Sequence, residues 1–351
     1  METPEPHSDP QEKTESLEET KDAAASSPDL SGSARLSAPA ESKDVPVSGS
    51  PDDSDFHAGF VTIIGEPNVG KSTLLNSLLG TKLSIVTPKP QTTRKRVLGI
   101  YTDNRMQIVF IDTPGILQPR YELHRAMLKI VQKSLKEVDT VLLLLDATRR
   151  ELPIERLEQQ LEMSLDQLGV PIIAAINKID LLKNRRELLP MIHQLSQTGK
   201  IREVVPISAV TGENLDRLLD TLYQYLPQSP PLYDPELLST HPERFFIAEF
   251  IREAVFLSTH EEIPYSTEVQ LVEVKEKENN TWYIAANIIV ERPSQKAILI
   301  GKDGSKIKEI GIKARQALEF HLGGKVYLDL HVKVQPKWRK NPQILRYYGY
   351  Y

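Results

Sequence analysis

Short apolar runs alternate with helically spaced apolar positions through the first two thirds of the chain. Apolar, partly β-branched runs at 60–64, 108–111, 172–176 and 204–207 are typical of buried strands. Amphipathic patterns predict helices at Lys71–Leu79, His124–Lys136, Pro153–Leu168, Arg185–Thr198 and Leu215–Leu226. This alternation predicts an α/β domain with a doubly wound, mostly parallel sheet and helices on both faces.

The pattern changes in the last third of the chain. Strand-like runs and helical stretches follow one another there as Glu268–Lys275, Trp282–Val290, Ser294–Ile300, about Ser305–Leu322 and Lys325–Val334. This order predicts a second, α+β domain. A proline cluster between the two domains marks a stiff linker, at Pro227, Pro230, Pro231 and Pro235. We predict a first domain at 56–227, a linker at 228–240, and a second domain with a C-terminal tail at 241–351. One continuous α/β domain is the disfavoured alternative.

Residues 1–55 carry 14 acidic and 4 basic side chains, a balance of −10. Because such a segment cannot bury enough apolar surface to offset its ordering entropy, we expect a disordered acidic tail. The segment is too acidic for an organelle transit peptide and lacks the apolar run of a signal peptide. The longest purely apolar run, at 141–145, is too short to span a membrane.

The chain of 351 residues has no cysteine, which excludes disulfides, thiol catalysis and zinc–thiolate sites and fits a reducing compartment. Its net charge of −5 hides an asymmetry, because residues 291–351 carry a balance of +8. A solvated face would explain some of those basic side chains. Their clustering favours a surface that faces phosphates.

The run Gly65-Glu66-Pro67-Asn68-Val69-Gly70-Lys71-Ser72 fits the pattern G-x-x-x-x-G-K-S/T between a predicted strand and a predicted helix. Such a loop presents backbone N–H groups and a helix N-terminus to phosphates, and its glycines allow close approach. Lys71 would reach the phosphates and Ser72 would bind Mg²⁺. A plain glycine turn is the alternative. We predict nucleotide-binding residues from Gly65 to Thr73.

A second motif, Asp112-Thr113-Pro114-Gly115, follows the apolar run at 108–111 and precedes Ile116. Asp112 would hold a water of Mg²⁺, and the Gly115 N–H would meet the γ-phosphate. In the loop Gln91-Thr92-Thr93-Arg94, we expect Thr93 rather than Thr92 to complete the Mg²⁺ shell, an ordinary loop hydroxyl being the alternative. The predicted nucleotide site therefore includes Asp112, Thr113, Pro114, Gly115 and Ile116. The predicted catalytic residues are Lys71, Thr93 and Gly115, and the predicted Mg²⁺ ligands are Ser72, Thr93 and Asp112.

A third motif, Asn177-Lys178-Ile179-Asp180, follows the apolar run at 172–176. Only guanine offers an N1–H and a 2-amino group side by side, which the Asp180 carboxylate would accept as a pair. Lys178 would cover the base plane and Asn177 would tie the loop to its neighbours. A backbone N–H of Ser208-Ala209 would meet the guanine O6. The order of the motifs predicts a GTPase.

In the second domain, the run Ile300-Gly301-Lys302-Asp303-Gly304 places G-x-x-G between two helical stretches. Such a pair of glycines is uninformative alone, but its setting among strands resembles a type II KH domain, whose loop clamps a single-stranded RNA backbone. Lys302, Lys306 and Lys308 would supply positive charge. The predicted RNA-binding residues are Ile300, Gly301, Lys302, Asp303, Gly304, Lys306 and Lys308.

A GTPase with Asp112-Thr113-Pro114-Gly115, Pro90-Gln91-Thr92-Thr93-Arg94 and a C-terminal KH domain resembles the Era family over about 58–349. The resemblance implies GTP and GDP with Mg²⁺ as ligands, GTP hydrolysis, binding to the 3′ end of small-subunit ribosomal RNA, and help in assembling the small ribosomal subunit. It also implies a monomer in the bacterial cytoplasm, with peripheral association with the inner membrane. An organelle matrix or stroma is the alternative location, if a transit peptide has been removed.

Two features bear on mechanism. Ile116 stands where a Ras-like enzyme has the glutamine that orients the attacking water. Asn68 stands where some related GTPases place an asparagine on K⁺, which makes K⁺ a candidate second cation; an ordinary turn residue is the alternative. A nucleotide-holding RNA-binding scaffold with negligible turnover is the alternative function, and a nucleoside kinase is disfavoured by Asn177 and Asp180.

Overall fold

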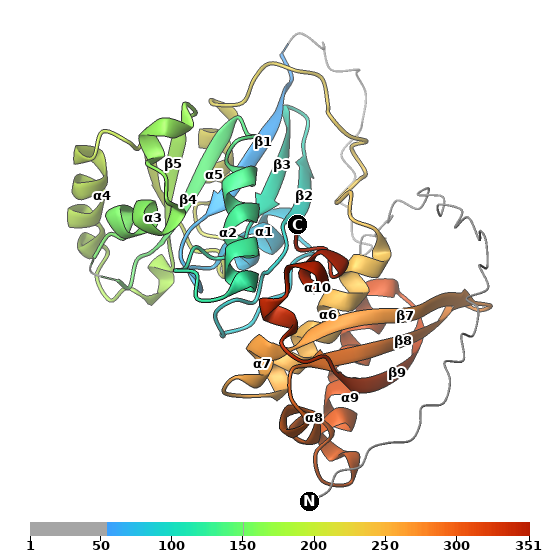
Figure 1. Ribbon diagram of the computed structural model, residues 1–351. Coiled ribbons are helices and arrows are strands. Elements are labelled where there is room, and N and C mark those ends of the chain that lie inside the picture. Colours follow the sequence, from blue (N-terminus) through green and yellow to red (C-terminus); the bar gives the residue numbers. More distant parts are fainter. Residues whose placement is uncertain (1–54, 150) are drawn as a thin grey trace, which may run out of the picture. The chain divides into compact units, whose positions relative to one another are not determined.

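The computed structural model describes residues 55–149 and 151–351, and the prediction of a disordered tail therefore lies almost entirely outside the described residues. The six strands of the first domain form one sheet in the order β2-β3-β1-β4-β5-β6 (Figure 1). β1, β3, β4, β5 and β6 are parallel, and only β2 runs antiparallel, against β3. Their bounds are β1 His57–Ile64, β2 Val97–Thr102, β3 Met106–Asp112, β4 Thr140–Asp146, β5 Ile172–Asn177 and β6 Glu203–Pro206. The predicted fold class is confirmed.

Helices cover both faces of this sheet. Apolar side chains of α1 and α5 share one buried cluster with the strands, and those of α2, α3 and α4 share another. The bounds are α1 Lys71–Leu79, α2 Glu122–Ser134, α3 Ile154–Leu161, α4 Leu188–Gln197 and α5 Leu215–Tyr223. Short 3₁₀ turns occur at η1 Leu165–Leu168, η2 Ile179–Leu181 and η3 Arg185–Glu187. Strand ends and helix starts therefore meet at one edge of the sheet, where α/β proteins bind ligands.

Two predicted helices are partly 3₁₀ turns in the structure, and the strands β2 and β4 were not predicted. The helix expected at 153–168 ends at Leu161, because Glu162 adopts a left-handed conformation (φ 54°) and only the turn η1 follows. The helix expected at 185–198 begins as the turn η3 and becomes α-helical at Leu188. β2 was not predicted, since its six residues include a glycine and only half of them are buried, which weakens the strand pattern.

The second domain begins with two helices, α6 Glu243–Ser258 and α7 Ile263–Ser266. A three-stranded sheet follows in the order β7-β8-β9, with β8 and β9 parallel and β7 antiparallel to β8. The remaining bounds are β7 Glu268–Lys277, β8 Thr281–Val290, α8 Pro293–Ile300, η4 Lys302–Gly304, α9 Ser305–Leu322, β9 Lys325–Val334, η5 Trp338–Lys340 and α10 Pro342–Tyr347. α6 was not predicted, because it is buried on nearly every side and charged residues lie among its buried positions, so it shows no clear apolar stripe.

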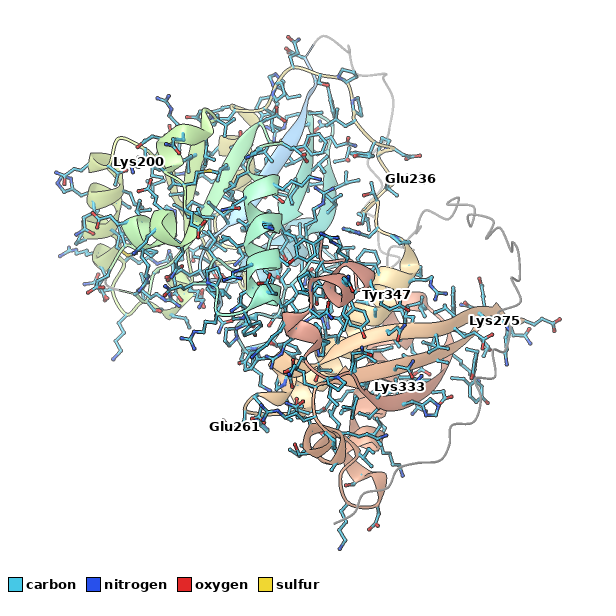
Figure 2. All side chains as sticks on the ribbon, viewed as in Figure 1. Lys200, Glu236, Glu261, Lys275, Lys333 and Tyr347 are labelled. Carbon is cyan, nitrogen blue, oxygen red and sulfur yellow. The ribbon has the colours of Figure 1, made fainter. Side chains whose placement is uncertain are left out.

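The proline-rich segment 228–240, all of it described, forms no helix or strand and includes Glu236 (Figure 2). It is nevertheless held against the first sheet. Gln107 accepts from the N–H groups of Leu232 and Tyr233 at 2.7 and 2.8 Å, and the Ile100 N–H donates to the Leu238 carbonyl at 2.9 Å. The segment is thus tethered along its length, and the domain boundaries stay predictions. Within the described residues, no helix has the length and apolarity needed to cross a membrane.

Candidate functional site

The loop between β1 and α1 has the shape that its two glycines allow. Gly65 (φ 152°) and Gly70 (φ 100°) both have backbone angles that favour glycine. A Cβ at Gly65 would lie 2.4 Å from the Leu144 carbonyl, and one at Gly70 would lie 2.4 Å from the Asn177 amide nitrogen. The ends of β4 and β5 therefore lie so close to the loop that only glycine fits at either position.

Lys71 is folded over this loop. Its side-chain nitrogen donates to the carbonyls of Gly65 and Glu66 at 3.2 and 3.1 Å, and the residue is only 6% exposed. Burial lowers the pKa of Lys71 to about 8, although the charges of Asp112 and Glu66 oppose that shift. The ammonium group is thus held where phosphates would meet the loop.

Three oxygen atoms from distant parts of the sequence meet at the start of α1. The Ser72 hydroxyl lies 2.8 Å from the Thr93 hydroxyl and donates to Asp112 Oδ2 at 2.7 Å. Asp112 is fully buried, and its Oδ1 has no hydrogen-bond partner among the described residues. Burial raises the pKa of Asp112, against the effects of Lys71 and neighbouring hydroxyls. A hard cation with oxygen ligands, such as Mg²⁺, fits this set.

Of the two candidate threonines, Thr93 lies at this cluster. Thr92 instead donates to the Lys89 carbonyl at 2.7 Å and lies 2.6 Å from the Thr87 hydroxyl, so it shapes the loop. The hollow beside the glycine loop, lined in part by the segment 85–93, has a volume of about 60 Å³. Asn177 and Asp180 do not line this hollow, so it contains only the part of the site beside the glycine loop and Thr93.

The segment from Asp112 to Ile116 packs against the glycine loop. The Thr113 hydroxyl donates to the Ile63 carbonyl at 2.8 Å, and the Ile116 N–H donates to the Gly65 carbonyl at 3.1 Å. A Cβ at Gly115 would lie 2.9 Å from the backbone of Pro67. Ile116 is 1% exposed and lies in the cluster that α2, α3 and α4 share, so its side chain packs the core.

The base-reading motif is tied to the glycine loop by Asn177. The Asn177 amide donates to the Val69 carbonyl at 2.8 Å and accepts from the Ala209 N–H at 2.9 Å. The N–H of Ser208 donates to Glu213, so an O6 contact requires the Ala209 N–H to be shared with Asn177. Asp180 is exposed, and its Oδ1 accepts from the Ser208 hydroxyl at 2.6 Å.

Sequence reasoning missed the partner of Lys178. The Lys178 side chain donates to Asp146 at 2.6 Å and to the Asn68 carbonyl at 2.7 Å, rather than lying free over a base. Asp146 ends β4 beside Asn177 on β5, so its position at a strand end was an available signal. Hydrogen bonds from Lys178 and Thr148 lower the pKa of Asp146 despite its burial.

The segment before Thr93 is also anchored by a residue that sequence reasoning missed. Asn76 on α1 accepts from the N–H groups of Leu83 and Ser84 at 2.9 and 2.8 Å and donates to the Ser84 carbonyl at 2.8 Å. The Ser84 hydroxyl is buried and is one of the groups that oppose the rise of the Asp112 pKa.

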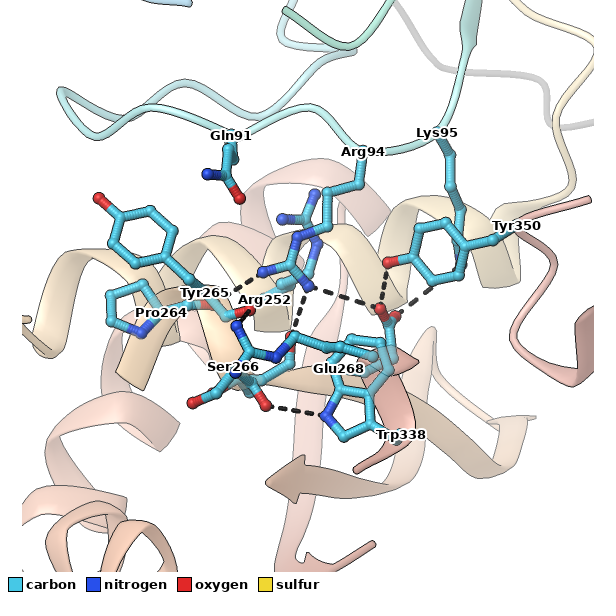
Figure 3. Close-up of polar contacts among 12 residues, drawn as sticks. Gln91, Arg94, Lys95, Arg252, Pro264, Tyr265, Ser266, Glu268, Trp338 and Tyr350 are labelled. Atoms are coloured by element: carbon cyan, nitrogen blue, oxygen red, sulfur yellow. Dashed lines mark hydrogen bonds and ion pairs between the residues drawn. The ribbon is translucent and has the colours of Figure 1, made fainter. Parts of the chain in front are cut away.

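Immediately after Thr93, Arg94 is buried among residues of the second domain (Figure 3). Its guanidinium donates to the carbonyls of Thr267 and Pro264 at 2.7 and 2.9 Å and lies 3.7 Å from Glu268. Glu268 also accepts from the Tyr350 hydroxyl. A fully buried guanidinium of this kind needs its carbonyl partners, which fixes the loop end next to Thr93.

The predicted RNA loop is built as its glycines require. Gly301 (φ 72°) and Gly304 (φ 75°) are both left-handed, and a Cβ at Gly301 would lie 2.8 Å from the Lys306 backbone nitrogen. Lys302 and Lys308 are exposed. Lys306 is instead paired with Glu309 at 2.7 Å, which leaves less of its charge for a phosphate.

A groove of about 1080 Å³ runs beside this loop between α9 and β9. β9 is an edge strand, and the 68% exposed Tyr327 borders the groove from the sheet face opposite the helices, because Val326 and Leu328 pack toward them. Ile312 on α9, 41% exposed, lines the groove with the exposed Lys308 and Arg315. Apolar and basic groups thus line this groove, a combination suited to single-stranded nucleic acid.

Two family profiles match the chain. Residues 60–178 match the family described as 50S ribosome-binding GTPase, and residues 262–339 match the KH domain. The chain is 43% identical over 298 residues to the GTPase Era of Geotalea daltonii, covering 85% of this chain and 99% of the relative. It is 45% identical over 298 residues to the GTPase Era of Aquifex aeolicus, covering 83% of this chain and 98% of the relative.

Two solved structures are similar to the chain, each with 44% identity, a TM-score of 0.80, and coverage of 84% of this chain and 99% of the solved one. One is a variant of Aquifex aeolicus Era bound to GDP·AlF₄⁻. The other is Era in complex with MgGDPNP and nucleotides 1506–1542 of 16S ribosomal RNA.

Proposed function

The chain belongs to the Era family of GTPases, and on this premise we propose that GTP controls its binding to the 3′ end of small-subunit ribosomal RNA during small-subunit assembly. Support comes from the solved relative that holds MgGDPNP together with 16S ribosomal RNA. The meeting of Ser72, Thr93 and Asp112 carries the nucleotide part of the proposal. A scaffold without turnover has no comparable support.

The residue roles follow from that geometry. Lys71 and the N–H of Gly115 would bind the γ-phosphate, and the loop from Gly65 to Thr73 would bind the rest of the phosphate chain. Ser72, Thr93 and Asp112 would hold Mg²⁺, which when bound supplies positive charge opposite the phosphates. Buried Lys71 supplies fixed charge in a site of low polarity, where it acts more strongly than in water.

Base choice would rest on the carboxylate of Asp180. Because this residue is exposed, its carboxylate is available to the N1–H and 2-amino groups of guanine. The hydroxyl of Ser208 would hold the carboxylate in position from the other side. Asn177 would act indirectly, by keeping the Val69 and Ala209 segments together.

Since Ile116 cannot orient water, we propose that a K⁺ ion bound by Asn68 assists hydrolysis. The side-chain nitrogen of Asn68 donates to the Pro88 carbonyl at 3.0 Å. The side-chain oxygen of Asn68 makes no hydrogen bond among the described residues. That amide therefore links the glycine loop to the segment 85–93 and keeps an oxygen for a cation.

This K⁺ proposal predicts faster turnover in K⁺ than in Na⁺ at equal ionic strength. Asn68→Gly should remove the severalfold difference while leaving GDP affinity nearly unchanged, because glycine adopts the positive φ of 65° at this position without strain. Phosphate release measured in both salts provides the check. Equal wild-type rates in the two salts would remove the K⁺ proposal and leave the GTPase assignment intact.

The proposed function itself is tested by two measurements on the full chain. Multiple-turnover phosphate release distinguishes an enzyme from a nucleotide-holding scaffold. Crosslinking to small-subunit ribosomal RNA with GTP or GDP bound, followed by sequencing, shows where the RNA is contacted and whether the nucleotide changes it. Crosslinks spread evenly along the RNA, unchanged by nucleotide, would contradict the proposal.

Location and assembly follow the family argument only. We place the protein in the bacterial cytoplasm as a monomer that associates peripherally with the inner membrane. Cell fractionation with and without a salt wash would test the membrane part, because a peripheral protein leaves the membrane fraction at high salt.

A further inference from the structure

A second hollow, of about 490 Å³, lies at one end of the KH sheet. It is formed by the start of β7, the ends of β8 and β9, and α10. Its lining residues are Gln270, Ile289, Lys333, Val334, Gln335, Gln343, Ile344, Tyr347 and Tyr348. Tyr347 on α10 and Lys333 on β9 mark it in Figure 2.

This hollow lies on the sheet face opposite the KH helices. Side chains alternate along each strand: Ile288, Val290 and Val332 pack with α6, α8 and α9. Ile289 points the other way and packs with Trp338 and Leu345 of the C-terminal segment. The hollow therefore shares strand β9 with the α9–β9 groove but opens on its other face.

The chemistry of the hollow suits a nucleobase. Tyr347 is 72% exposed, yet its hydroxyl accepts from the Gln270 amide at 2.7 Å and its ring lies 5.5 Å from that of Tyr348. An exposed aromatic ring held in place is a stacking surface for a base. The glutamine amides offer donors and acceptors to base edges, and Lys333 offers a charge. The described lining residues include no carboxylate.

The position of the hollow identifies its occupant. The α9–β9 groove is lined by β9 up to Leu330, and the hollow begins at Lys333. Three residues of strand span about 10 Å. The outer edge of β9 pairs with no other strand among the described residues. A single-stranded nucleic acid in the groove can therefore cross this edge to reach the hollow.

We propose that the hollow beside Tyr347 binds a base of single-stranded RNA whose neighbouring nucleotides occupy the groove between α9 and β9. Tyr347 stacks on the base, and Lys333 neutralises the phosphate that crosses the edge of β9. This inference rests on the proposed RNA-binding function and adds a site to it on the opposite face of the sheet.

The test uses the full chain and two oligonucleotides from the 3′ end of small-subunit ribosomal RNA. The short one has about four nucleotides, the length that a KH groove clamps. The long one adds several nucleotides at each end. Tyr347→Ala should weaken binding of the long RNA by about 5- to 150-fold, the equivalent of ~1–3 kcal/mol per stacked base. Binding of the short RNA should be unchanged.

Three matched variants sharpen this measurement by fluorescence anisotropy. Tyr347→Phe keeps the ring but loses the hydrogen bond from Gln270, so it should bind the long RNA much more tightly than Tyr347→Ala does. Phe320→Ala removes an 82% exposed ring on α9 that lines neither hollow nor groove, and should change nothing. Lys333→Gln should lower the salt dependence of long-RNA binding by about one unit of slope.

The outcomes separate the two proposals. Unchanged long-RNA binding by Tyr347→Ala would overturn the second site, and would favour a protein partner on this face. Equal losses with both RNAs would also overturn it, because the defect would then lie in the groove. A parent protein that binds neither RNA would instead contradict the proposed RNA-binding function itself.

Discussion

The nucleotide site and the RNA surface of this chain are built on opposite principles. Lys71, Asp112 and Asn177 are each less than 9% exposed. Lys71 is held by carbonyls of its own loop, whereas Asp112 and Asn177 are held by hydrogen bonds to residues far away in sequence. Lys302, Lys308 and Tyr327 are exposed, and their spacing comes from one helix and one edge strand. Charges that are fixed and excluded from water stabilise phosphate transition states more strongly, whereas RNA binding uses charges and stacking surfaces that are exposed to solvent.

This contrast predicts how each region responds to substitution. In the buried site, one altered atom removes a contact that nothing else can replace. On the exposed surface, several lysines and aromatic rings each contribute to RNA binding. Each substitution there therefore removes only a fraction of the RNA-binding free energy. Four experiments test the contrast, and the effects are expected to decrease from the first to the last.

The largest effect is expected for Asp112→Asn. The substitution removes one of the three oxygens that meet at Ser72 and the only charge among them, so turnover of GTP should fall by about 100- to 1,000-fold. RNA affinity without nucleotide should be unchanged. Phosphate release and anisotropy on the same preparation provide the check. Turnover within tenfold of the parent would show that this buried cluster is not the catalytic centre.

Asp180→Asn should come next. Losing a charge-assisted pair to guanine should weaken GTP binding by about 1.5–3 kcal/mol and favour xanthine nucleotides. Ser208→Ala is the matched control, since it removes the hydroxyl behind the carboxylate and leaves the charge in place. Calorimetric titration with GTP and with XTP measures both. Unchanged GTP affinity in Asp180→Asn would show that another group reads the base.

On the RNA surface, Gly304→Asp should weaken short-RNA binding by about tenfold, or ~1.4 kcal/mol. Gly304→Asn is the control, because asparagine and aspartate tolerate the left-handed angle at this position almost equally, and only one is charged. A Cβ at Gly304 meets nothing closer than Ile307 at 4.0 Å, whereas one at Gly301 would clash with Lys306. Equal binding by the two variants would show that the phosphates do not approach this loop.

The smallest effect concerns His124, which lies between the two regions. Its Nε2 lies 3.1 Å from the Gln91 side chain, and burial, with Arg94, Arg339 and Arg120 nearby, lowers its pKa to about 4. The folded chain therefore binds this proton more weakly than the unfolded chain does, so stability falls as the pH drops from about 6.5 towards 4.

Between pH 7.5 and 5.5, the parent should therefore lose about 1 kcal/mol more unfolding free energy than His124→Gln. Denaturant titrations at both pH values measure the difference. Parallel losses in the two proteins would show that His124 does not carry this part of the acid sensitivity.

The two fold classes follow from the sequence alone, and so do the motifs on which the proposed nucleotide site rests. The glycines, the lysine and the carboxylates of these motifs stand at short, regular spacings next to apolar strand runs, and such spacings are readable along the chain. The sequence pattern also predicted α9 and β9 at their observed bounds, and it predicted the end of α8 at Ile300, where the KH loop starts. α6, which buries charged as well as apolar residues, and half-buried β2 left no clear periodic signal, so both were missed.

The pairing of distant residues became visible in the tertiary structure. Lys178 lies on Asp146, Arg94 is buried among carbonyls of the second domain, and Tyr347 lies beside Gln270. Those partners lie 32 to 173 residues apart. Periodicity records whether a side chain is buried, because burial depends on the face of its own element. The partner of a buried or exposed polar group depends on where other elements pack, which local spacing does not encode.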